Sequence, residues 1–204
     1  MIQRWVAAVN TVLVFSAFLV FVCESNIAHG TTRKAINSFA GKYIAYADRF
    51  YMCEEGDSLD WRWNLRHSHW NPAKPNELQR LTGWLNGSIN HVTDSSWAQV
   101  NLDRRSNNMW KDNALIFKFP AGSCTALRKN IPGFYSTVFK LPKDGPCDIP
   151  PGNYEVKNES VNWAFPAVPI LQYGEYRFRF RLGAAKAKNP YTCLVVECHV
   201  VPQS

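Results

Sequence analysis

One stretch near the end of the chain constrains the fold more than any other segment. Across residues 176–182, aromatic or aliphatic side chains alternate strictly with Arg177, Arg179 and Arg181. Successive side chains of a β-strand point to opposite faces, so this period of two predicts a strand with one buried and one solvated face. A single strand cannot bury its apolar face alone, so the rest of the chain must supply further strands and a second layer.

Similar short segments recur along the chain. Strands are expected over 43–53, 61–66, 98–102, 115–119 and 191–201, separated by turns such as Ser106-Asn107-Asn108. Residues 81–92 alternate poorly, because Gly83 and Gly87 interrupt them. Several short strands without a βαβ rhythm predict an all-β fold, either a sandwich or a barrel.

One segment, 124–139, does not fit a strand. Its apolar residues recur at spacings of three and four, at Leu127, Ile131, Phe134, Tyr135, Val138 and Phe139. Pro132 and Gly133 interrupt this pattern, so at most one or two short helical turns are expected. Such an element at the rim of a β-sandwich either covers an apolar cavity or plugs the end of a solid core.

Residues 1–30 have the composition of a secretory signal peptide. Arg4 precedes an apolar run over 12–22 that only Ser16 interrupts, and small residues suited to cleavage follow between positions 23 and 30. A run this short is typical of a signal peptide, since a spanning helix needs about 20 apolar residues. The alternative is an uncleaved signal anchor. We therefore expect a secreted, extracellular protein in which residues 31–204 form a single domain.

The cysteines and acceptor sequences agree with an oxidising compartment. The chain has six cysteines, and Cys23 lies in the expected leader. None of the others forms a C-x-x-C pair, which argues against a zinc site or a thioredoxin-like motif. Their odd number leaves one thiol that is either free or intermolecular. Asn86-Gly87-Ser88 and Asn158-Glu159-Ser160 are acceptor sequons, so N-glycosylation is expected at Asn86 and Asn158.

Motifs of catalysis and cofactor binding are missing. The sequence contains no Gly-x-Ser-x-Gly, His-Glu-x-x-His, Gly-x-Gly-x-x-Gly or P-loop motif. His67 and His69 would share one face of a strand and could hold a metal ion, but no neighbouring residue completes a ligand set. Several carboxylates are also available, at Asp48, Asp60, Asp94 and Asp103. Nothing pairs them into a catalytic dyad, so we expect no enzyme activity, no cofactor and no metal.

The net charge of +7 favours acidic partners such as lipid head groups or sulfated glycans. The secretory route argues against nucleic acid. The segment 61–70 combines tryptophan, arginine and histidine and could stack against sugars, although half-buried strand aromatics explain the same residues.

Four motifs in the last third resemble a known family in their order. They are Cys147-Asp148-Ile149-Pro150-Pro151-Gly152-Asn153-Tyr154, Trp163-Ala164-Phe165-Pro166, Gly174-Glu175-Tyr176-Arg177 and Thr192-Cys193-Leu194-Val195-Val196. This order resembles the ganglioside-activator branch of the ML lipid-recognition superfamily and its secreted insect relatives, including the CheA and CheB chemosensory groups. The match covers residues 120–200, with weaker support at 85–87.

The resemblance implies two disulfides, Cys53–Cys193 and Cys124–Cys147. Cys198 has no family partner, and a Cys53–Cys198 bridge is the alternative. The cysteines that fasten additional rim loops in the activator are missing, which affects the shape of a cavity mouth.

The resemblance further implies an immunoglobulin-like two-sheet sandwich that opens into a β-cup with a short helical rim. Lipid acyl chains or another apolar ligand would lie between the sheets. The residues expected to line this cavity are Phe117, Phe119, Leu127, Ile131, Phe134, Tyr135, Trp163, Phe165, Tyr176, Phe178 and Phe180. The three arginines of 176–182 would form a basic stripe on the opposite face, suited to an anionic membrane surface or an acidic partner.

The expected function is therefore binding of a lipid or another hydrophobic ligand, with a chemosensory or lipid-presenting role. The alternative is a secreted interaction module with a solid core, which binds glycans or a protein receptor through a basic, Trp-rich surface.

Overall fold

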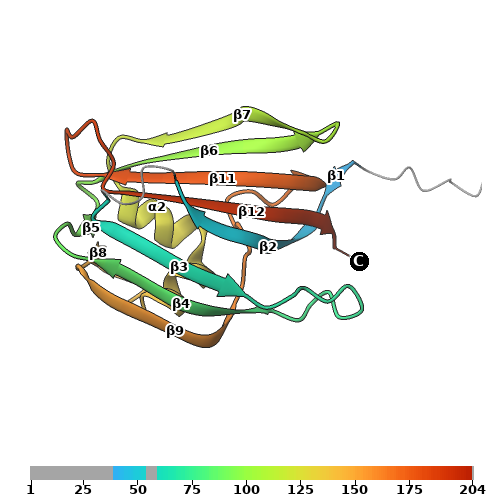
Figure 1. Cartoon of the computed structure of the whole chain (residues 1–204), viewed down its shortest axis with the longest axis horizontal. Coiled ribbons are helices and arrows are strands. Elements are labelled where there is room, and N and C mark those ends of the chain that lie inside the picture. The colour runs from blue at the N-terminus through green and yellow to red at the C-terminus, as the bar shows by residue number, and fades with distance from the viewer. Residues whose placement is uncertain (1–38, 54–58, 204) are drawn as a thin grey trace, which may run out of the picture. The chain divides into compact units, whose positions relative to one another are not determined.

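Two main antiparallel sheets with a short helical segment between them form most of the described chain (Figure 1). The computed structural model describes residues 39–53 and 59–203. The expected leader and its cleavage site lie outside the described residues. The prediction of an all-β fold is confirmed, and the architecture is a sandwich with two separate main sheets.

The larger sheet has five strands in the order β2-β12-β11-β6-β7. In chain order these are β2 (Tyr43–Met52), β6 (Trp97–Ser106), β7 (Met109–Phe119), β11 (Gly174–Gly183) and β12 (Thr192–Pro202). The hairpin between β6 and β7 turns at Asn107 and Asn108, which both have positive φ angles, of 51° and 59°. Asparagine tolerates this conformation, which a two-residue hairpin turn of type I′ requires.

The smaller sheet has three strands in the order β3-β4-β9. They are β3 (Trp61–His67), β4 (Gln79–Gly87) and β9 (Gly152–Val161). Two short ladders complete the fold. One pairs β1 (Ala40–Gly41) with β10 (Leu171–Gln172), and the other pairs β5 (Val92–Thr93) with β8 (Asp148–Ile149).

Strand β4 lies in the segment whose sequence alternates poorly. Its buried positions are occupied by Gln79, Leu81, Leu85 and Gly87, with Gly83 also on the inner face. A side chain at Gly83 would meet the backbone oxygen of Asn64 at 1.9 Å, and one at Gly87 would meet the Trp61 ring at 2.3 Å. Gly83 and Gly87 thus occupy inward positions where no side chain fits. Because glycine adds no apolar side chain, the sequence of this strand does not show the alternation of hydrophobic residues.

The segment 124–139 forms two short helices, α2 (Ser123–Asn130) and α3 (Pro132–Val138). Each is about two turns long, so the helical content exceeds the expected one or two turns. The break falls at Ile131, with φ −133°, and Pro132 begins α3 at a position where its missing N–H costs little. The first turn of α2 is held from outside the helix, because Asp94 accepts the Thr125 backbone N–H at 2.8 Å.

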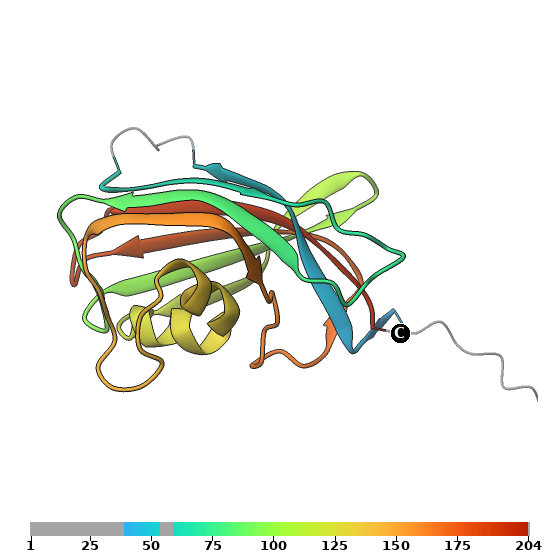
Figure 2. The same cartoon turned by 90° about the horizontal axis from the view of Figure 1, so that it is seen from below.

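Strands β2 and β3 contact each other and bring the two sheets together at one edge. Helices α2 and α3 lie between the sheets on the other side, and α3 packs on β9 (Figure 2). The larger of two buried clusters joins α3 to the inner face of the smaller sheet, around Trp61, Leu81, Leu85, Tyr135 and Val156. A second cluster lies in the larger sheet, at Leu102, Tyr176, Cys198 and Val200.

Both disulfides that the resemblance implies are present. Cys53 joins β2 to Cys193 in β12, and Cys124 of α2 joins Cys147, beside β8. Cys198 is buried and unbridged, so the alternative Cys53–Cys198 pairing is wrong. Two disulfides are typical of an oxidising compartment. No helix in the described part of the chain is long and apolar enough to cross a membrane.

Candidate functional site

A cavity lies between the larger sheet and the helical segment. It consists of two adjoining lobes of about 80 and 140 Å³. The lobes share one set of lining residues, which come from β6, the helical segment, the 162–173 segment and β11: Ala98, Val100, Leu127, Ile131, Phe165, Phe178, Phe180 and Leu182. The two lobes therefore adjoin each other across a shared apolar wall.

The alternation of β11 explains how the sequence builds this wall. Phe178, Phe180 and Leu182 point into the cavity, and their rings or side chains form one surface. Phe178 stacks on Phe180 with ring centroids 5.9 Å apart and on Phe165 at 5.6 Å. Val100 of β6 pairs with Phe180 on one side and with Phe117 of β7 on the other. This small side chain leaves a gap between two aromatic neighbours.

The lobes differ in their remaining walls. The smaller lobe reaches β2, β3 and β12, where it meets Phe50, Trp63, Leu194, Val196 and Cys198, and it also meets Phe134 of α3 and Trp163 of the 162–173 segment. The larger lobe reaches β7 and the 162–173 segment, where it meets Leu115, Phe117, Phe119, Val168 and Leu171.

The larger lobe opens to solvent along β7. Leu115 and Phe117 line this lobe and are nevertheless 50% and 39% exposed. Ile170, next to the lining residue Leu171, is also exposed. Apolar side chains of this size on a cavity rim mark an entrance, since a closed core would have covered them.

The interior carries almost no polar groups. Ser123 and Asn130 are the polar side chains of the larger lobe, and each already donates a hydrogen bond to a backbone oxygen of the protein. Tyr46 and Arg181 border the smaller lobe, but each lies between two inward neighbours, so its side chain points to the outer face. Burial raises the pKa of the Cys198 thiol to about 12, so this thiol is protonated at neutral pH.

Most of the residues expected to line a cavity do so. Lining positions are occupied by Phe117, Phe119, Leu127, Ile131, Phe134, Trp163, Phe165, Phe178 and Phe180. Tyr135 and Tyr176 do not line it. Tyr135 packs against Phe139 in the larger buried cluster, and Tyr176 lies in the second cluster, where its hydroxyl donates to the Gln172 backbone oxygen at 2.8 Å.

Several lining residues were not singled out from the sequence. Ala98, Val100 and Leu102 form a predicted strand face, and Leu182 continues the alternation of β11, yet nothing in either pattern distinguishes cavity wall from solid core. The signal that could have found them is size, because small side chains between aromatic neighbours leave space.

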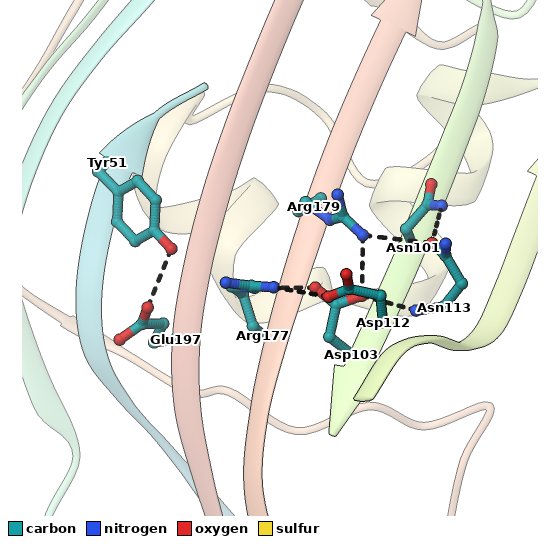
Figure 3. A network of polar contacts seen from close by, with 8 residues as sticks. All are labelled: Tyr51, Asn101, Asp103, Asp112, Asn113, Arg177, Arg179 and Glu197. Atoms are coloured by element: carbon teal, nitrogen blue, oxygen red, sulfur yellow. Dashed lines mark hydrogen bonds and ion pairs between the residues drawn. The ribbon is translucent and has the colours of Figure 1, made fainter. Parts of the chain in front are cut away.

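The arginines of β11 do not form a free basic stripe. Asp103, fully buried on β6, accepts Arg177 Nε at 2.8 Å, Arg179 Nη2 at 2.9 Å and the Asn113 backbone N–H at 2.8 Å (Figure 3). Arg177 also donates to Asp112 at 2.9 Å. Burial raises the pKa of Asp103, but these hydrogen bonds outweigh it and hold the pKa below its usual value. Two of the three positive charges are thus balanced by carboxylates within the outer face.

The tryptophans of segment 61–70 are packed into the protein. Trp61 is buried and donates to the Asn90 backbone oxygen at 2.8 Å, and Trp63 donates to Thr192 Oγ1 at 2.6 Å. Trp70 stacks on Tyr46, with ring centroids 4.3 Å apart. These rings belong to the core or to an intramolecular stack, so they do not form a free stacking surface.

The polar groups considered for chemistry have structural partners. Asp60 accepts hydrogen bonds from Ser88 and Asn90, and these lower its pKa although burial raises it. Asp94 holds Thr125 at the start of α2. His67 lies beside Gln79, and no group of three metal-ligating side chains occurs among residues 39–53 and 59–203.

Both expected glycosylation sites are exposed on the smaller sheet. Asn86 lies on β4 and Asn158 on β9.

No protein-family model matches the sequence, and a search of curated proteins finds no match either.

Proposed function

We propose that the protein is a secreted, non-enzymatic binder of a lipid or another hydrophobic ligand. The observation that carries this proposal is the two-lobed cavity, whose inward side chains are uncharged and which opens at the exposed rim of Leu115 and Phe117. An apolar space of this kind is the usual form of a small-molecule site.

Empty space inside the cavity favours the uptake of an apolar ligand. Side chains around a void forfeit dispersion contacts that a ligand would restore. Each buried CH₂ group of a ligand contributes about 0.8 kcal/mol. The larger lobe is similar in size to a cavity of about 150 Å³ that accommodates benzene. A slender hydrocarbon chain that extends through both lobes fits this space better than a bulky ring system.

The charge pattern limits what can be buried. The inward-facing side chains carry no charge, so a buried ionised group would have no partner, and its burial would be strongly unfavourable. A polar head group would therefore remain at the β7 opening, close to solvent. An amphiphile with one hydrocarbon tail meets these conditions.

The motif order of the last third supports the same proposal, because it resembles a lipid-binding family. The two disulfides fasten strands and helix around the cavity and agree with a secreted protein. A chemosensory or lipid-presenting role is the finer part of the proposal and rests on the resemblance alone.

The experiment compares thermal unfolding of delipidated protein with and without palmitic acid, 1-hexadecanol or a total lipid extract. A ligand at about 100 times its Kd stabilises the folded state by about 2.7 kcal/mol, and for a domain of this size that raises Tm by roughly 5–11 °C. A hydrophilic glycan such as heparin serves as the control. If no lipid raises Tm while a glycan does, the protein is a surface-binding module and the cavity proposal fails.

A further inference from the structure

The outer face of the smaller sheet presents an exposed tryptophan. Trp84 lies in the central strand β4 and is 38% exposed. Among the described residues, no ring or cation packs on its indole and no hydrogen-bond partner meets its nitrogen. This separates Trp84 from Trp61 and Trp63, whose indole nitrogens both donate within the protein. More than a third of this aromatic residue is thus exposed to solvent in the middle of a sheet.

An acceptor sequon begins two residues further along the same strand. Asn86 is followed by Gly87 and Ser88, which complete the sequon. Side chains two residues apart on a strand share a face, and their Cα atoms are separated by about 7 Å. Asn86 is exposed beside Trp84 on the outer face. A sugar attached to the Asn86 amide would therefore start within reach of the indole.

The neighbouring strands provide a polar frame around this pair. Asn64 of β3 and Glu155 of β9 flank Trp84, and Arg62 of β3 and Asn153 of β9 flank Asn86. These residues offer donors and acceptors for the hydroxyl and N-acetyl groups of a sugar.

A pyranose ring matches such a surface. One face of the ring presents C–H groups, which carry small positive charges and are apolar, while an aromatic face is negative. Stacking removes apolar area of both partners from water. We propose that Asn86 carries an N-linked glycan whose first sugar ring stacks on Trp84, which makes the glycan a structural part of the smaller sheet. This inference rests on the secretory route of the proposed function and is independent of the cavity.

The second sequon provides an internal control. Asn158 lies on β9 of the same sheet and is also exposed. It has a positive φ of 54°, and Val156, two residues before it, is buried. No aromatic ring precedes Asn158 at the spacing that Trp84 has to Asn86. A glycan at Asn158 would therefore extend into solvent without a platform.

The test is a double-mutant cycle on the full chain secreted from a eukaryotic host. The variants are Asn86→Gln, Asn158→Gln and Trp84→Thr, with Trp84→Phe as the conservative replacement. Peptide mass spectrometry gives the occupancy of each sequon, and thermal unfolding gives Tm. We expect Asn86→Gln to lower Tm by about 2–4 °C in the wild-type background. The same change should have no effect in the Trp84→Thr background and an intermediate effect in the Trp84→Phe background. Asn158→Gln should change Tm equally in all three, because any cost of glutamine at this positive φ does not depend on residue 84.

Tryptophan fluorescence provides a second readout that does not depend on stability. Enzymatic removal of the glycan should increase acrylamide quenching in the wild type and in Asn158→Gln, but not in Trp84→Phe. The proposal is overturned if Asn86 is unoccupied, or if Asn86→Gln lowers Tm equally with and without Trp84. It is also overturned if the indole is protected only by added chito-oligosaccharide, which would make the face a site for external sugars. The lipid-induced Tm shift of the same variants reports on the cavity separately, so either proposal can fail alone.

Discussion

A cavity-filling substitution at Val100 tests the site most sharply, because it should stabilise the empty protein and remove ligand binding together. Val100 lines both lobes and lies between Phe117 and Phe180 in the register of the larger sheet. Val100→Phe places a third ring in the gap between them. Measured cavity costs of about 24 cal/mol per Å³ make filling a lobe of about 80 Å³ worth at most about 2 kcal/mol.

That gain corresponds to a rise in Tm of at most about 4–8 °C for the ligand-free protein. The lipid-induced rise in Tm should disappear, because the new ring occupies the space of the ligand. Gln99→Phe is the matched control, since Gln99 lies next to Val100 on the opposite face of β6 and bonds Asn101 there. Differential scanning calorimetry with and without palmitic acid measures both quantities. A folded Val100→Phe protein that keeps the full lipid shift would refute the assignment of this cavity as the ligand site.

Three further predictions concern the framework around the cavity. Cys198, whose buried thiol has a pKa raised to about 12, should resist maleimide labelling in the native protein and react after unfolding; stoichiometric native labelling would contradict its burial. Asp103→Asn should cost about 1.5–3 kcal/mol, measured by urea unfolding, because two partly exposed arginines lose their shared carboxylate while Arg177 keeps Asp112. The pKa of Asp103 in the folded chain lies below the usual 3.8. The stabilisation that its ionised carboxylate gives the folded state is therefore present above about pH 4 and is lost as the pH falls through the folded pKa. Acid unfolding of Asp103→Asn should accordingly depend less on pH in that range. Removal of the Cys53–Cys193 bridge, which closes 140 residues, should cost about 5 kcal/mol, against about 3 kcal/mol for the 23 residues of Cys124–Cys147. Equal losses in denaturant midpoints would argue against the chain-entropy explanation.

Strand periodicity predicted the centre of the larger sheet best, because β6 and β11 alternate apolar with polar side chains along their length. The alternation of 176–182 reappears as β11, with Phe178 and Phe180 inward and the arginines outward. The smaller sheet was harder to predict. In β4, Gly83 and Gly87 occupy inward positions that Asn64 and Trp61 fill from the neighbouring strand, so the burial pattern is carried partly by missing side chains.

Long-range contacts set the limits of prediction at the site. The sequence marks Arg177 and Arg179 as a solvated basic stripe, but only the pairing of β11 with β6 brings Asp103 between them. Similarly, nothing local separates Tyr176 from Phe178, although one belongs to a solid cluster and the other to the cavity wall. Whether an inward position meets packed atoms or empty space depends on the side chains of the opposite layer, which here is the helical segment.

Native mass spectrometry of the protein, secreted from a eukaryotic host and purified without detergent, tests ligand binding most directly. We expect an additional mass beyond the chain, its glycans and two disulfides, which organic extraction removes and which fragmentation identifies as a lipid. Val100→Phe should lack this mass, while Gln99→Phe should retain it. A wild-type mass without any extractable ligand, together with no uptake from an added lipid extract, would contradict the proposal of a lipid-binding cavity.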